Sequence, residues 1–156
     1  MDRRVRQKFQ VGFTLMELLL VMAILAILAG VVMVSINPAG HFTKARDAER
    51  QSEVYAIVSA LHQYALDNGS SFPEGLTTEP LEICRTNSES CVGKYDLSAL
   101  TDGEVYLTSV PVDPECEKDN SDCEDSATGY LLSLSDTGRV SVTATHAESG
   151  EIVVTK

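Results

Sequence analysis

The sequence predicts an α+β fold, in which a long N-terminal helix has a protruding first half and an amphipathic second half packed on a small C-terminal antiparallel β-sheet. Three observations predict this fold. An apolar run fills residues 13–36, helical spacing of apolar residues continues over residues 37–69, and strand-like segments separated by glycine-containing turns fill residues 130–156. A chain of 156 residues has room for one modest domain and one appendage.

Charge is divided unevenly along the chain. The formal net charge is −11, yet four of the 12 basic side chains lie within residues 1–12, where Asp2 is the only acidic residue. We interpret residues 1–12 as a basic leader peptide that is removed. The rest of the chain is strongly acidic and repels phosphate groups, so no nucleic-acid partner is expected.

The apolar run predicts a membrane span. Residues 18–34 contain no charged or strongly polar side chain. As a helix, residues 13–36 measure about 36 Å, enough to cross a bilayer core of about 30 Å. Basic residues stay on the cytoplasmic side, so we expect a single-pass protein of the cytoplasmic membrane with an extracytoplasmic C-terminal domain, in contact with lipid.

Two other kinds of N-terminal segment could also explain an apolar run of this kind. A cleaved secretory signal has a shorter apolar region followed by small residues at the cut site, and no such site follows here. A plain signal anchor leaves Glu17 unexplained, because a carboxylate facing lipid costs several kcal/mol and usually marks a function.

The stretch "KFQVGFTLMELLLVMAILAIL" resembles the signal of type IV prepilins and type II secretion pseudopilins. The resemblance implies a pilin-like fold. It also implies that a prepilin peptidase cuts between Gly12 and Phe13 and methylates the new amine. Glu17 is then the fifth residue of the mature protein, where the family motif has glutamate.

The same resemblance implies a structural subunit of a helical homopolymer, assembled by an ATPase and a platform protein. The filament serves pilus assembly, protein secretion or competence, and lies outside the cell or in the periplasm. The new α-amine of Phe13 is positively charged at neutral pH. We expect it to pair with Glu17 of a neighbouring subunit, because unpaired charges in an apolar core are heavily penalised.

Residues 37–69 predict an amphipathic helix that continues into the globular domain. Pro38 and Gly40 predict a weak point near residues 36–40. The charged residues between Lys44 and Glu53 are expected on a solvated surface, and Asn68-Gly69 ends the helix. An apolar stripe at helical spacing is expected to pack on the sheet: Val54, Ile57, Val58, Leu61, Tyr64 and Ala65.

Residues 70–129 are rich in turns and contain all four cysteines: Cys84, Cys91, Cys116 and Cys123. One short helix is expected near residues 95–101. In an exported protein, the spacing favours two small disulfide loops, 84–91 and 116–123, although four cysteines allow three pairings. Free thiols in a reducing compartment are the alternative. Residues 130–156 predict a three-stranded antiparallel sheet, with strands near residues 130–135, 139–146 and 151–155.

The acidic stretch "DPECEKDNSDCEDS" offers a possible metal site. Clustered carboxylates suit calcium, and the resemblance to major pseudopilins implies calcium in this region. The spacing does not fit an EF-hand, so a solvated acidic loop without metal is the alternative. No other cofactor is expected. The candidate ligands are Asp113, Glu115, Asp119, Asp122 and Asp125.

No catalytic motif was found. The sequence lacks a nucleophile elbow, a phosphate loop, H-E-x-x-H and a dinucleotide fingerprint, so we expect no enzyme and no catalytic residue. The three histidines are scattered and are expected to have surface or packing roles. An alternative function is a non-polymerising, single-span membrane-anchored binding module outside the cytoplasm. Such a module would remain a full-length chain that keeps residues 1–12.

Overall fold

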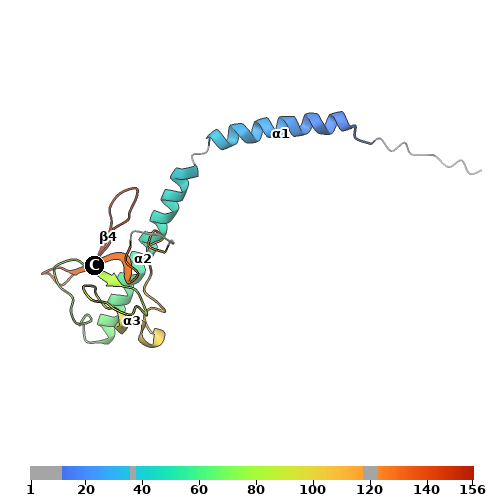
Figure 1. Cartoon of the computed structure of the whole chain (residues 1–156). Helices are drawn as coiled ribbons and strands as arrows, with labels where there is room; N and C mark the ends of the chain where they lie inside the picture. The colour runs from blue at the N-terminus through green and yellow to red at the C-terminus, as the bar shows by residue number, and fades with distance from the viewer. Residues whose placement is uncertain (1–11, 36–37, 118–122) are drawn as a thin grey trace, which may run out of the picture. The chain divides into compact units, whose positions relative to one another are not determined.

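The structure, a computed structural model, describes residues 12–35, 38–117 and 123–156. It divides into two compact units, residues 1–39 and 40–156. Figure 1 shows the order of the elements along the chain. They are α1 (Leu15–Ser35), α2 (Pro38–Asp67), β1 (Leu81–Cys84), α3 (Ser98–Thr101), the 3-10 turn η1 (Asp102–Glu104), β2 (Ala127–Leu134), β3 (Val140–Ala144) and β4 (Ile152–Thr155). The predicted α+β fold is confirmed.

Helix α1 begins with a side-chain cap. The Thr14 hydroxyl oxygen accepts a hydrogen bond from the Glu17 amide at 3.2 Å, which satisfies one of the free N–H groups of the first turn. The apolar segment Leu15–Met33 within α1 is long enough to cross a membrane, and none of it is buried. An apolar helix with none of its span buried requires lipid or other helices around it.

Helix α2 buries the predicted stripe. Val54, Ile57 and Leu61 are fully buried. The helix ends at Asp67, and Gly69 follows with a φ of +68°. This left-handed conformation suits glycine and stops the helix, as Asn68-Gly69 predicted. The predicted weak point falls partly on residues 36 and 37, which lie outside the described ranges.

The sheet has four strands, not the three predicted for residues 130–156. Its order is β1-β2-β3-β4, and every pair is antiparallel. The additional strand β1 has the sequence LEIC, which is too short to show a period. Tertiary contacts stabilise it instead. The Thr128 hydroxyl donates to the Ile83 carbonyl at 2.9 Å, and the Gly129 amide donates to the Glu82 carboxylate at 3.1 Å.

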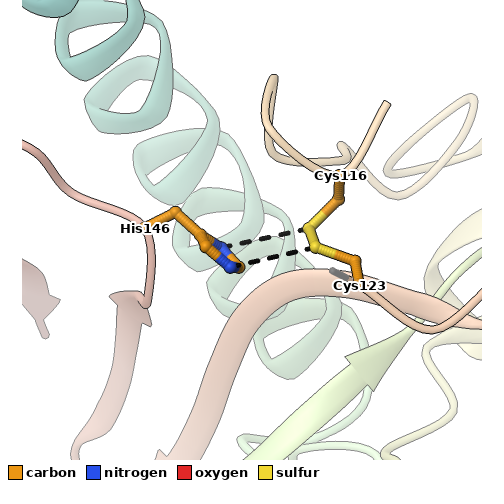
Figure 2. Close-up of side chains that lie close together, drawn as sticks. All are labelled: Cys116, Cys123 and His146. Atoms are coloured by element: carbon orange, nitrogen blue, oxygen red, sulfur yellow. Dashed lines mark hydrogen bonds between the residues drawn. A yellow bond between two sulfur atoms is a disulfide. The ribbon is translucent and has the colours of Figure 1, made fainter. Parts of the chain in front are cut away.

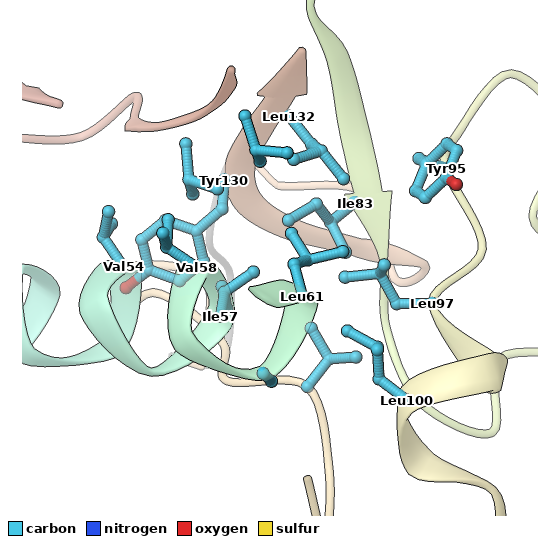
Figure 3. Packing of buried hydrophobic residues seen from close by; sticks show 14 of the residues in the cluster. Val54, Ile57, Val58, Leu61, Ile83, Tyr95, Leu97, Leu100, Tyr130 and Leu132 are labelled. Carbon is cyan, nitrogen blue, oxygen red and sulfur yellow. The ribbon is translucent and has the colours of Figure 1, made fainter. Parts of the chain in front are cut away.

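The hydrophobic core lies between α2 and the sheet, and α3 contributes to it (Figure 3). Figure 3 shows side chains of α2 pointing towards Ile83 on β1 and Tyr130 and Leu132 on β2. Leu100 on α3, within the range predicted for a short helix, is fully buried. The core positions on β3 alternate with outward residues, as the sequence predicted, and they are Val140, Val142 and Ala144.

Both small disulfide loops are present. Cys84 is bonded to Cys91 and Cys116 to Cys123, which is the pairing that the spacing favoured. The first loop follows β1 and the second precedes β2. Each bond closes a short loop and restricts the unfolded chain in a region with little regular structure.

Candidate functional site

The N-terminal candidates lie at the start of α1. Gly12, Phe13 and Thr14 precede the helix and are exposed, and 78% of the Phe13 surface is accessible. A peptide bond outside regular structure is open to a peptidase. The geometry therefore leaves the Gly12–Phe13 bond accessible immediately before the apolar helix. Residues 1–11 of the predicted leader lie outside the described ranges.

Glu17 is exposed in the first turn of α1. The unpaired N–H groups at a helix N-terminus carry a partial positive charge, which favours a carboxylate there. Thr14 and Glu17 have the spacing of a capping box, T-x-x-E. The motif therefore places a carboxylate one helical turn from Phe13, the residue predicted to carry the new amine.

A second cluster surrounds Arg50, which the sequence predicted on a solvated surface. That prediction is wrong, because the Arg50 side chain is fully buried. Its Nε and Nη2 donate to the two carboxylate oxygens of Asp113 at 2.8 and 3.1 Å, and Asp113 is also fully buried. Its Nη1 donates to Asp47 at 2.9 Å and to Glu148 at 3.1 Å. Arg50 thus joins α2 to residues 111–117 and to the β3–β4 loop.

Neighbouring bonds reinforce this Arg50 cluster (Arg46, Asp47, Arg50, Asp113 and Glu148). Arg46 pairs with both oxygens of Glu148 at 2.6 and 2.7 Å. The Asp47 carboxylate accepts the amides of Glu148 and Ser149 at 3.0 and 2.7 Å. Two guanidinium groups and three carboxylates are therefore held in one network between segments distant in sequence.

The pKa shifts follow from these contacts. Hydrogen bonds from Arg46 and then Arg50 lower the pKa of Glu148 to about 2. The Glu148 amide, together with Ser149 and Arg50, holds the pKa of Asp47 well below its usual range. Burial acts to lower the pKa of Arg50, but its three carboxylate partners outweigh burial and raise it. Asp47 and Glu148 are therefore ionised at neutral pH, and Arg46 and Arg50 keep their positive charge.

The Arg50 cluster includes one of the predicted calcium ligands, Asp113. Asp113 does not fit, because the Arg50 guanidinium occupies both of its carboxylate oxygens. The Glu115 amide donates to Asp113 at 2.8 Å, and Asp125 is exposed. Asp119 and Asp122 lie outside the described residues. Asp113 is the candidate ligand that the geometry does not support, and its pairing with Arg50 favours the alternative of an acidic loop without metal.

Sequence reasoning missed the cap by Thr14 and the burial of Arg50. The T-x-x-E spacing was a usable signal for the cap. No local signal exists for Arg50, since its partners Asp113 and Glu148 lie 63 and 98 residues away in the sequence.

Two comparisons with known proteins found similarities, one of them to the N-terminal segment. Residues 10–33 match the family described as "Prokaryotic N-terminal methylation motif". The chain is 42% identical over 74 residues to "Type II secretion system core protein G" of Klebsiella michiganensis, which covers 47% of this chain and 48% of that protein. The chain thus matches about half the length of this curated relative. No solved structure matches the chain.

Proposed function

We propose that the chain is a structural subunit of a type IV filament, because residues 10–33 match the prokaryotic N-terminal methylation motif and half of the chain is similar to a core protein of a type II secretion system. A prepilin peptidase removes residues 1–12 and methylates Phe13. The mature subunit then polymerises from the cytoplasmic membrane through α1. The filament serves pilus assembly, type II protein secretion or competence, and the named relative favours secretion.

The proposal rests on the length and the exposed apolar surface of helix α1. This helix has 21 residues, so it is about 32 Å long. It is apolar on every side, and its large side chains from Leu15 to Met33 are exposed. Such a helix suits lipid before assembly and a bundle of identical helices afterwards, and both environments exclude water. The exposed Gly12–Phe13 bond lies where removal of the leader would free the helix N-terminus.

Glu17 sets the register between subunits in this proposal. Cleavage places a positive amine on Phe13, four residues before Glu17. Removing one partner of a buried ion pair costs about 3–5 kcal/mol, so subunits are stable only where amine and carboxylate meet. A helix with no other charged side chain between Leu15 and Ser35 slides easily along its neighbours. One charged pair therefore selects a single stagger.

The expected partners follow from the chemistry of assembly. An apolar helix leaves the bilayer only if work is done on it, which requires an assembly ATPase acting through a platform protein in the membrane. The domain of residues 40–156 then lies on the extracytoplasmic side, where its two disulfides persist. No step of this role requires catalysis by the chain itself.

The test uses the full-length chain expressed with its own assembly genes. The Glu17→Gln variant keeps the size of the side chain and removes its charge. We expect normal loss of residues 1–12 by intact mass, but at least a tenfold decrease in sheared filaments. Glu49→Gln is the matched control, because Glu49 is exposed on α2 and the same change there leaves filaments unaffected.

Two outcomes contradict the proposal. Abundant filaments from Glu17→Gln would remove the role of the carboxylate. A mature chain that keeps residues 1–12, without a methyl group on Phe13, would favour a non-polymerising, membrane-anchored binding module.

A further inference from the structure

A histidine lies against the second disulfide loop, as Figure 2 shows. Nδ1 of His146 is 3.9 Å from Sγ of Cys116, and its Nε2 is 3.9 Å from Sγ of Cys123. One ligand atom from each residue lies within 4.8 Å of the others. The sequence predicted only a surface or packing role for His146, because the three histidines are scattered along the chain.

Hydrogen bonds select the tautomer of His146. The Thr145 hydroxyl donates its one hydrogen to the Gly129 carbonyl at 2.8 Å. Its oxygen is also 3.0 Å from Nδ1 of His146, so it accepts from an Nδ1–H group. In a neutral imidazole the lone pair is then on Nε2, the nitrogen that faces Cys123. This is the tautomer that binds a metal through Nε2, with the other nitrogen held by a hydrogen bond.

Gly129 keeps the three residues close together. It has a φ of +81°, and an added Cβ would lie 2.8 Å from Cβ of Asp113, 2.9 Å from Sγ of Cys116 and 3.2 Å from Nδ1 of His146. Only glycine leaves room for this packing. Asp113 also faces Nδ1, at 4.0 Å from its Oδ2, while Arg50 holds both of its oxygens. Asp113 thus supports the imidazole and is not available as a ligand.

We propose that Cys116, Cys123 and His146 form a redox-gated zinc site. In the oxidised protein the disulfide leaves no thiolate to bind a metal. A thiol or phosphine reductant adds two electrons and two protons to the disulfide and gives two thiols. Zn²⁺ then displaces both protons and is bound by the two thiolates and by Nε2 of His146.

The geometry suits zinc. Zinc bonds of about 2.3 Å to sulfur and 2.0–2.1 Å to nitrogen place tetrahedral ligand atoms about 3.5–3.8 Å apart. The Nε2–Sγ distance to Cys123 is already 3.9 Å. Sγ of Cys116 lies 3.9 Å from Nδ1, so this sulfur must move away from Sγ of Cys123 and towards Nε2 once their bond is broken. Cys116 is buried, whereas Cys123 and His146 are half-exposed, so the fourth position faces water. Two cysteines, one histidine and water form a known zinc ligand set.

The experiment titrates Co²⁺ into the full-length chain in detergent micelles, before and after reduction with a water-soluble phosphine. The phosphine takes oxygen from water to become its oxide, and it leaves no thiol that competes for metal. We expect thiolate-to-cobalt charge-transfer absorption at one ion per chain after reduction, none before it, and its loss when one equivalent of Zn²⁺ is added. Far-ultraviolet circular dichroism checks that the reduced protein stays folded.

Matched variants separate this site from the first disulfide loop. The Cys84→Ser/Cys91→Ser variant should bind as the wild type does, and Cys116→Ser/Cys123→Ser should not bind. Thr145→Val removes the acceptor for Nδ1 and should weaken zinc binding about 10- to 100-fold, and His146→Gln at least as much. His41→Gln, an exposed histidine on α2, is the control and should have no effect.

Three results would overturn the proposal. They are equal cobalt binding by the oxidised protein, binding that survives Cys116→Ser/Cys123→Ser, and loss of the folded signal on reduction. Loss of the folded signal on reduction would overturn the proposal because only the folded protein holds the three ligands together.

Discussion

The Arg50 cluster predicts a large loss of stability when Arg50 is replaced by methionine. Methionine fills much of the same space but leaves the fully buried Asp113 carboxylate without a counter-ion. Breaking a buried pair in this way costs about 3–5 kcal/mol of the free energy of unfolding. At about 4 °C per kcal/mol for a domain of this size, the thermal midpoint falls by about 12–20 °C.

The assay is thermal unfolding of the full-length chain in detergent, followed by near-ultraviolet circular dichroism of the tyrosines. Arg46→Met is the matched control one turn earlier in α2. Arg46 is 31% exposed and pairs with Glu148, so its loss should lower the midpoint far less than the loss of Arg50.

A double variant sharpens the test. Arg50→Met/Asp113→Asn removes the unpaired charge, and the new amide oxygen still accepts the Glu115 N–H. We expect this variant to be more stable than Arg50→Met alone. Two results would contradict this prediction. They are a midpoint that falls no more in Arg50→Met than in Arg46→Met, and a double variant that is less stable than Arg50→Met.

Two further predictions concern pH and calcium. The pKa of Glu148 is lowered from 4.5 to about 2, so its ion pairs stabilise the fold above pH 4.5, and this contribution disappears as the pH falls towards 2. The fall in thermal midpoint between these pH values should be smaller in Glu148→Gln than in the wild type, whereas Glu74→Gln, at an exposed position, should behave as the wild type. Millimolar calcium should leave the wild-type midpoint unchanged, because Arg50 occupies the carboxylate oxygens of Asp113. A rise in the midpoint that Asp125→Asn abolishes would contradict this expectation and restore the calcium site.

The sequence was sufficient for features that depend on local spacing. Helix α1 follows from its long run of apolar residues, and the buried stripe of α2 from positions such as Ile57 and Leu61. The disulfide loops follow from the equal spacing within each cysteine pair. In these cases one segment contains the whole physical signal.

Features that depend on contacts between distant segments could not be predicted in the same way. Strand β1 has four residues, and its partners on β2 lie more than forty residues further along the chain. Arg50 looks like a surface residue among charged neighbours until Asp113 and Glu148 are brought to it. His146 reaches the second disulfide only because β3 ends beside that loop. Tertiary packing supplies the information that these short segments lack.

Imaging of purified filaments at side-chain resolution would give the distance from the Phe13 amine nitrogen to the Glu17 carboxylate of an adjacent subunit. We expect a separation of about 4 Å or less, with a methyl group on the amine and residues 1–12 absent. A Glu17 carboxylate that faces lipid or water, or that meets only the amine of its own chain, would contradict it.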